Sequence, residues 1–465
     1  MKQWIKRVRS IERVSDLLDE LTLSRLRRVS FWLLFILVMT PVYAMARSLF
    51  FEHHTEEAYL GNLLAIGRVW QLLIRQLGYL GLIIAVILIA KAFLKKKRRG
   101  TQAVDFLKAH SVETFMIGFL ILAFLSTLYS PNRSLAWNGA FYRREGFETY
   151  LAYAGLFSMA LTQNKKTGLL LMQSFIGVAF ILTLFSFIDS PYLNNLLTLS
   201  ETSSIFHNAN HFGYYLLMAL MVNFVVLLYQ SQYKKAPLAG FTVSFALMTL
   251  ILITNRTFGV FLALILGFLI SLCMIFWLKR SFLRRAFLII LLFISVSVLS
   301  SMPIDYLSSE GSHLSEDVGS VISGSEDSGN AGSGRWSLWT TGLMFAGERP
   351  LLGYGPDNLG ERYSETGHST DRPHNELIQF MASLGVPATL LYIGAVIALA
   401  SQAFKHRKTL SIETLGLGFA VIAYLISSMF GNTMFYTTPF YLMIFALTYQ
   451  FITIDKDAFK TPQSI

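Results

Sequence analysis

The chain has 465 residues, of which 54% are hydrophobic and only 14% are charged, and its mean hydropathy is +0.51. A soluble domain carries about 25% charged residues, so this composition excludes an ordinary water-soluble protein and indicates a membrane protein. The net charge is +11, but the basic residues lie in short clusters between apolar runs. That arrangement is typical of membrane topology and not of nucleic-acid binding, so no nucleic-acid partner is expected.

The single cysteine, Cys273, lies within an apolar run. It cannot form an intrachain disulfide, and it has no second thiol with which to share a metal ion. The segments expected on the cytoplasmic side contain no Gly-rich phosphate loop, and no metal motif is visible. The sequence therefore predicts neither a cofactor nor a metal site.

The predicted elements begin with residues 1–28, where apolar and basic residues alternate, and which we expect to lie as a helix on the cytoplasmic surface of the membrane. A membrane-spanning helix needs about 20 apolar residues. Suitable runs occur at residues 31–50, 71–94, 111–129, 147–163, 168–188, 209–230, 237–254, 258–278, 286–302, 374–402, 413–430 and 436–453. The sequence thus predicts an all-α polytopic membrane protein with about 12 transmembrane helices, nine in residues 29–302 and three in residues 373–453.

The orientation follows from the lysines and arginines. If the N-terminus is cytoplasmic, every inward loop is basic and the outward segments contain no lysine. This predicts a multi-pass protein of the cytoplasmic membrane with both termini inside, including the tail at residues 454–465. Arginine binds phosphate through two donors at once, so an outer face whose cations are all arginine suits a phosphate-bearing ligand. Depletion of outer lysine by topology alone explains the pattern equally well.

One outward segment, residues 303–372, is long enough to form a large extracytoplasmic loop. Residues 308–334 are rich in Ser, Gly, Glu and Asp, and we expect them to be mobile. Residues 335–345 have the pattern of an amphipathic interfacial helix with Trp336 and Trp339 as anchors. Turns are predicted after it, where Pro and Gly cluster at residues 350–356.

The strongest local motif is RPHNELIQFMASLGVPA, residues 372–388. Here His374 is predicted to open a transmembrane helix, with Pro373 in its first turn and Asn375 as a cap. A helix N-terminus lowers the pKa of a histidine, which favours a neutral ring able to accept a proton. The alternative is an interfacial histidine that only hydrogen-bonds to water.

Several arginines are candidates to accompany this histidine. Arg256 lies in TNRTFG, between two predicted spans with almost no loop. A charge so close to hydrocarbon is a functional-site candidate, although a turn arginine can simply reach water. The other candidates on the outer face are Arg335, Arg372 and the pair Arg143 and Arg144, which could also be ordinary rim residues.

The segment HNANH places His207 and His211 four residues apart, on one face of a helix. No third metal ligand is predicted nearby, so a polar helix start is the preferred interpretation. Asn208 and Asn210 would then face the bundle.

The stretch from Arg335 to Ala388 resembles the signature region of the O-antigen ligase and O-antigen polymerase superfamily. The resemblance rests on Arg335–Trp336, the P-L-L-G-Y-G turn at residues 350–355 and the pair His374–Asn375. Gly385 also fits the ligase-type pattern, whereas Ala388 stands where that pattern has Gly. Residues 207–210 and 255–259 are similar to two further family elements.

The resemblance implies a membrane glycosyltransferase of the C type. Such an enzyme passes a glycan from an undecaprenyl-diphosphate carrier to an acceptor hydroxyl at the outer face of the membrane, without a metal and with inversion at the anomeric carbon. His374 would take the proton of the acceptor, and Arg256 and Arg335 would stabilise the diphosphate. The residues expected to bind substrate are Arg143, Arg144, Arg372, Asn375, Asn210 and His207. Ligase and polymerase remain equally open.

Two other classes of function are compatible with a polytopic chain. A glycolipid transporter or flippase would also need cationic groups facing a cavity, but it predicts ionisable residues at mid-depth and internal repeats, and the sequence shows neither. A non-catalytic membrane sensor or assembly partner predicts that loss of His374 leaves the cell's polysaccharide unchanged.

Overall fold

The fold is described from a computed structural model, which covers residues 18, 21–48, 56–99, 107, 108, 110–141, 143–186, 204–206, 208–229, 235–299 and 334–460. Within these residues the chain is helical and contains no strand, as the sequence predicts. The helices are α3 (Leu23–Ser48), α4 (Glu56–Arg99), α6 (Ser111–Leu128), α7 (Arg133–Asn138), α8 (Phe147–Leu161), α9 (Lys165–Ser186), η1 (Ser204–Phe206), α11 (Ala209–Leu228), α12 (Lys235–Thr254), α13 (Phe258–Leu278), η3 (Arg280–Phe282), α14 (Leu283–Leu299), α16 (Arg335–Glu348), α17 (Gly360–Glu365), α18 (Glu376–Leu384), α19 (Val386–Lys405), α20 (Ile412–Ser428) and α21 (Thr438–Lys460).

Nine helices in the described part of the chain are long and apolar enough to cross a membrane. Every apolar run predicted from the sequence falls on one or two of the described helices. The chain is therefore a polytopic α-helical membrane protein, and the total of twelve spans stays a prediction.

The prediction of one continuous helix over residues 374–402 is wrong. The structure has two helices there, α18 and α19, because the chain breaks at Gly385. Gly385 has a φ of +91°, and a Cβ at this position would come within 2.3 Å of the Leu351 carbonyl oxygen. Only glycine meets both conditions at low cost. Pro373 is also not in the first turn of α18, since the cap is Asn375 and the helix begins at Glu376.

The N-terminal boundary also differs from the prediction, since α3 begins at Leu23 and so includes the end of the predicted surface segment. Its apolar run continues the helix without a break, which places Arg25 and Arg27 on the first turns of a span. Residues 1–17, 19 and 20 of the predicted surface segment lie outside the described residues, and so does the predicted mobile stretch at residues 308–334 except for Gly334.

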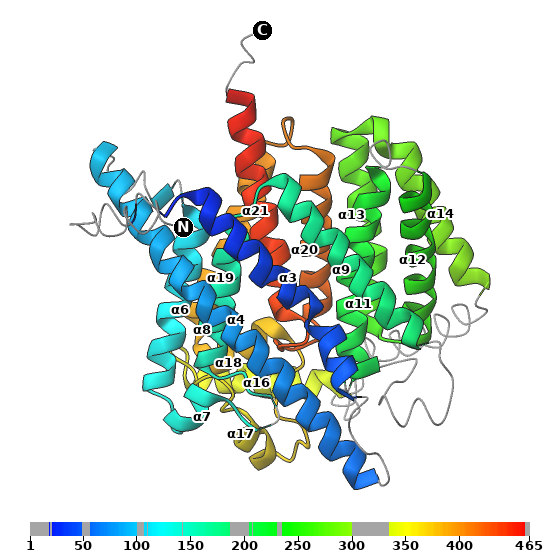
Figure 1. The fold of residues 1–465 in the computed structure, drawn as a ribbon. Helices are drawn as coiled ribbons and strands as arrows, with labels where there is room; N and C mark the ends of the chain where they lie inside the picture. Colours follow the sequence, from blue (N-terminus) through cyan, green and yellow to red (C-terminus); the bar gives the residue numbers. More distant parts are fainter. Residues whose placement is uncertain are drawn as a thin grey trace.

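The core is built around α11, in which every side chain from His211 to Leu228 is buried. The helices α9, α12, α13 and α20 pack around it, and α21 packs between α20 and α8. Figure 1 shows α4 as a long helix that crosses the outside of the bundle. It contacts α8 so closely that a Cβ on Gly155 would lie 1.9 Å from the Gly78 carbonyl oxygen, an approach that small residues permit between membrane helices.

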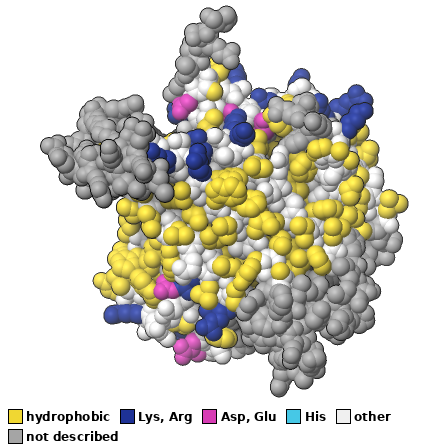
Figure 2. Space-filling view, viewed as in Figure 1, with side chains coloured by type: hydrophobic (Ala, Val, Ile, Leu, Met, Phe, Trp, Pro, Cys, Tyr) yellow, Lys and Arg dark blue, Asp and Glu magenta, His cyan; other side chains and the backbone are white. Residues whose placement is uncertain are grey.

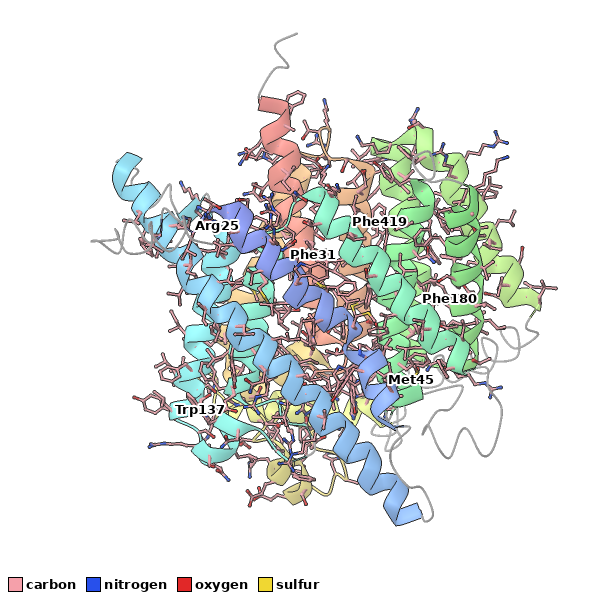
Figure 3. The ribbon with its side chains drawn as sticks, viewed as in Figure 1. Arg25, Phe31, Met45, Trp137, Phe180 and Phe419 are labelled. Atoms are coloured by element: carbon pink, nitrogen blue, oxygen red, sulfur yellow. The ribbon has the colours of Figure 1, made fainter. Side chains whose placement is uncertain are left out.

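The bundle has two polar ends with a hydrophobic band between them (Figure 2). We call one the α16 end, because α7, α16, α17 and the turn between α20 and α21 lie there. At the opposite end Lys165 pairs with Asp455, near the C-terminus of α21. Figure 2 shows a broad hydrophobic band with basic side chains above and below it, and Figure 3 places Trp137 at the α16 end and Arg25 at the other. A bilayer would cover this band.

Candidate active site

Four residues other than glycine have a positive φ in the described part of the chain, and all four lie in turns at the α16 end. They are Arg144 (+53°), Arg256 (+51°), Asp357 (+59°) and His374 (+52°). This conformation is sparsely populated for residues with a Cβ and costs about 1–3 kcal/mol. Such strain is retained where the surrounding structure requires it, and it often marks a functional site.

His374 lies in the turn before α18, with both ring nitrogens engaged. Its Nε2 atom is 3.2 Å from the Thr370 hydroxyl, and its Nδ1 atom is 3.1 Å from the amide nitrogen of Asn432. A hydroxyl donates or accepts, and an amide offers either group, so both contacts suit a neutral imidazole of either tautomer. The ring is thereby held in one orientation.

The environment of His374 is cationic. Its pKa is lowered from 6.5 to about 4, first because the ring is buried and then because Arg143 and Arg335 are close. The sequence predicted this direction, but from the helix terminus instead of burial and guanidinium groups. At neutral pH the ring is uncharged, and the nitrogen that carries no proton can act as a base once an acceptor hydroxyl replaces its protein partner.

Arg143 reaches the same place from the turn before α8. Its Nε and Nη2 atoms each donate to Asp371 at 3.0 Å, and its Nη1 atom lies 3.4 Å from the Met434 sulfur. Burial alone would raise the pKa of Asp371, but Arg372 and Arg143 lower it to about 2. Asp371 is therefore ionised and fixes Arg143 beside His374.

Arg335 begins α16 and lies close enough to His374 to lower its pKa. The helix is anchored further along, where the Trp339 ring lies 6.0 Å from the Phe430 ring. A Cβ on Gly342 would lie 3.2 Å from Pro373, so α16 covers the turn that carries His374. The structure thus brings together two of the residues that the sequence predicted to act jointly.

Arg256 occupies the turn between α12 and α13, and its side chain is exposed. The turn is tied to α11, since Asn255 donates to the Ala209 carbonyl oxygen at 2.8 Å. Phe258, two residues on, packs on Phe430 at 5.5 Å between ring centres. Arg256 therefore lies at the same end as His374, with Phe430 between its turn and α16, and no direct contact with His374 is described.

The turn between α20 and α21, residues 429–437, was not predicted as part of the site. Asn432 contacts His374, the Thr433 carbonyl oxygen accepts from Arg372 at 3.0 Å, and Met434 contacts Arg143. All three turn residues are buried. This turn therefore holds the side chains of His374, Arg372 and Arg143 in their relative positions. Its only signal in the sequence is the polar stretch Gly-Asn-Thr between two apolar runs.

Residues 243–393 match a family model described as O-antigen ligase. The match agrees with the resemblance to the O-antigen ligase and polymerase superfamily that the motifs of this segment carry. It extends from α12 to α19 and includes Arg256, Arg335 and His374. No curated protein matches the chain. Arg143 and the turn at residues 429–437 lie outside the O-antigen ligase segment, and the fold adds them to its site.

Arg372, also in the O-antigen ligase segment, is buried and faces protein groups. It pairs with Asp357 and donates to Thr433. Asp357 in turn accepts from the backbone N–H groups of Ala140 and Glu145, at 2.7 and 3.1 Å. This ion pair joins the turn after α7 to the turn before α18.

The remaining residues that the sequence predicted to bind substrate lie in different parts of the chain and do not form one cluster with His374 in the described structure. Asn375 caps α18 by accepting from the Ile378 N–H at 3.1 Å, and Asn210 is half-buried in the first turn of α11, where its N–H donates to Asn208. Arg144 contacts α4 through its backbone carbonyl oxygen, which accepts from Gln71, and its side chain lies against Phe141. His207 lies outside the described residues.

Glu376, the first residue of α18, was not predicted as a site residue. It is buried and accepts hydrogen bonds from the hydroxyls of Tyr392 (3.1 Å) and Tyr424 (3.3 Å). These contacts fix the start of α18 against α19 and α20. No group of three or more His, Cys, Asp or Glu side chains comes together as a metal site anywhere in the described ranges.

Proposed function

We propose that the protein is a membrane glycosyltransferase that moves a glycan from an undecaprenyl-diphosphate-linked donor to an acceptor hydroxyl. The single observation that carries the proposal is the neutral His374 ring, fixed by Asn432 and Thr370 beside Arg143 and Arg335. This arrangement provides a base for a hydroxyl and positive charge for a diphosphate. The match of residues 243–393 to the O-antigen ligase family supports the same chemistry.

The reaction is one displacement at the anomeric carbon of the donor. The acceptor oxygen forms a bond to that carbon while the bond from the carbon to the diphosphate oxygen breaks. The diphosphate leaves with the electron pair, and the acceptor proton moves to a ring nitrogen of His374. General-base assistance of this kind contributes about 10²–10⁴-fold to the rate. A single displacement inverts the configuration at the anomeric carbon.

The leaving diphosphate needs its negative charge neutralised more than it needs a proton. In the proposal Arg335 and Arg256 contact its oxygens, where negative charge grows in the transition state. Their guanidinium groups offer paired donors in a fixed plane, which match phosphate oxygens. Asp371 and Arg372 do not reach the substrate and act by positioning Arg143 and the turn at residues 429–437.

Donor binding also prepares the base. Arg143 and Arg335 hold the pKa of His374 down in the free protein. The negative charge of a bound diphosphate offsets these guanidinium charges and therefore raises the pKa of the ring. His374 is thus neutral before the donor binds and a stronger base once it has bound.

The membrane arrangement in this proposal places the α16 end at the outer face of the cytoplasmic membrane. The basic loops then face the cytoplasm with both termini, as the topology rule predicts. The proposed architecture is that of a C-type glycosyltransferase with twelve spans, and the reaction requires no metal ion.

The test is transfer by the purified full-length protein supplied with a carrier-linked oligosaccharide. If the donor alone gives a ladder of longer carrier-linked chains, the protein is a polymerase. If product appears only after addition of a separate acceptor glycolipid, it is a ligase. Absence of transfer with donor and every acceptor tested would contradict the proposal.

A further inference from the structure

A second group of arginines lies beside the candidate active site, on α4. Arg68 and Arg75 are seven residues apart, so both project from one face of the helix. On that face, between them, Gln71 donates to the backbone carbonyl oxygen of Arg144 at 3.2 Å and to the Thr149 hydroxyl at 3.3 Å. This face of α4 therefore brings Arg68 and Arg75 to the turn that holds Arg144.

Arg143 and Arg144 serve different places although their Cα atoms are only about 3.8 Å apart. Arg143 points to Asp371 and His374, as described above. Arg144 has a φ of +53°, and its Nε atom donates to the Phe141 carbonyl oxygen at 3.1 Å. Its guanidinium carbon lies 5.5 Å from the centre of the Phe141 ring. The positive φ at Arg144 thus accompanies a division of the two arginines, with Arg143 at the His374 site and Arg144 at a neighbouring site.

Within the described part of the chain, the second group carries more positive charge than its carboxylate partners balance. Among the carboxylates that the structure describes, only Glu148 pairs with it, through Arg75. The other Glu148 oxygen accepts from the Trp137 indole at 3.0 Å. Burial, followed by the charges of Arg68 and Arg75, lowers the pKa of Arg144. The group is therefore self-repelling, and a bound anion would relieve the repulsion.

The position of the group in the bilayer indicates the kind of anion. The apolar span of α4 begins at Gly67, so Arg68 stands at its outer boundary. Leu72 and Ile83 are exposed further along the same helix, and Phe141, next to Arg144, is 71% exposed. Arginine and aromatic rings at the end of a span are typical of the headgroup region, and the exposed apolar face beyond them suits a hydrocarbon chain.

We propose that Arg68 and Arg144, with the buried Arg75 and its Glu148 partner behind them, bind the phosphate of a second membrane lipid, the lipid-anchored acceptor of the transfer, whose hydrocarbon chain lies along α4. This inference rests on the proposed function, since it assigns an acceptor to the same reaction. The diphosphate of the donor lies with Arg335 and Arg256, and the acceptor phosphate lies on the far side of the Arg143–Arg144 turn. The acceptor glycan then extends from Arg144 toward His374.

The experiment measures binding of undecaprenyl monophosphate to the purified full-length protein by native mass spectrometry. Two lipids are expected to bind to the wild-type protein. Arg68→Gln/Arg144→Gln is expected to weaken one of the two binding events at least about tenfold, because charge-assisted hydrogen bonds to phosphate are lost. Arg133→Gln, which removes an exposed arginine of α7 at the same end, is expected to bind both lipids as the wild type does.

Unchanged binding by the double variant would overturn the assignment. Displacement of the second lipid by an equal concentration of inorganic phosphate would also overturn it, because a free anion would then be the ligand. Since Arg68 is exposed, Arg68→Gln alone provides a variant whose folding is not at risk, and it should show a smaller loss at the same site. Binding requires no chemistry, so failure of the transfer assay leaves this result unaffected.

Discussion

The Nδ1 atom of His374 lies 3.1 Å from the amide nitrogen of Asn432, which is 58 residues away in the chain. The contact joins the turn before α18 to the turn between α20 and α21. When the Asn432 amide is turned so that its otherwise unpartnered oxygen accepts from Nδ1–H, Nε2, beside Thr370, carries the lone pair that can accept a proton. A base whose ring is fixed in this way loses little freedom when substrate binds, which is the usual requirement for a positioned catalytic group.

Asn432→Ala should therefore lower kcat about 10–100-fold with little change in the KM for donor, because His374 remains but is no longer oriented. Steady-state transfer rates at several donor concentrations measure kcat and KM separately. Thr433→Ala is the matched control, since only the backbone carbonyl of Thr433 bonds to Arg372. Equal effects from both variants would indicate a general disturbance of the turn and no specific role for Asn432.

Arg335→Lys should reduce transfer about 10–100-fold although the charge is kept, because lysine cannot present two donors in one plane to a phosphate. Arg349→Lys is the control at the other end of α16, where Arg349 lies over the Tyr354 ring at 4.6 Å. That variant should retain nearly full activity. Wild-type glycan chain length with Arg335→Lys would show that the guanidinium does not bind the diphosphate.

Arg143→Gln should move the acid limb of the pH profile of kcat/KM to higher pH. Arg143 is the largest charge that lowers the pKa of His374, and its loss also frees the carboxylate of Asp371, which raises that pKa. The wild-type limb should lie near pH 4, since the base is lost below its pKa. A limb at the same pH in the variant would mean that His374 is not the titrating group.

The buried pair of Asp357 and Arg372 should matter for stability. Asp357→Ala leaves the Arg372 charge buried and two backbone N–H groups without their acceptor, so it should destabilise the fold by about 3–5 kcal/mol. Glu348→Gln removes one charge from the half-exposed pair with Arg362 and should cost at most about 1 kcal/mol. Thermal unfolding of the two detergent-purified variants measures both losses of stability. Similar unfolding midpoints for Asp357→Ala and Glu348→Gln would contradict a stabilising role of the buried pair.

The sequence was a good guide where the physical signal is local. The apolar runs located the spans because a bilayer requires about 20 consecutive apolar residues, and the motif around His374 lies within 17 residues of chain. Arg335 lies close enough to His374 for its charge to lower the pKa of the ring, and its role beside His374 stays a prediction. The break at Gly385 was missed because apolar residues continue on both sides of it.

The partners that depend on tertiary packing could not be predicted. Arg143 meets Asp371 across 228 residues, and Asn432 meets His374 across 58. Nothing in the local pattern distinguishes Asp357 or Asp371 from other polar residues of the long loop. The close packing of α4 against α8 is likewise invisible to a count of apolar residues, so the grouping of Arg68 and Arg75 with Arg144 emerged only from the fold.

The most direct test of the account compares His374→Ala with the wild type in transfer from a purified carrier-linked donor, with donor binding measured on the same samples. His374→Ala should bind the donor with unchanged affinity but transfer about 10²–10⁴-fold more slowly, while His406→Ala, at the opposite end of the bundle beside the C-terminus of α19, should transfer normally. Transfer at the wild-type rate by His374→Ala would contradict the assignment of His374 as the base.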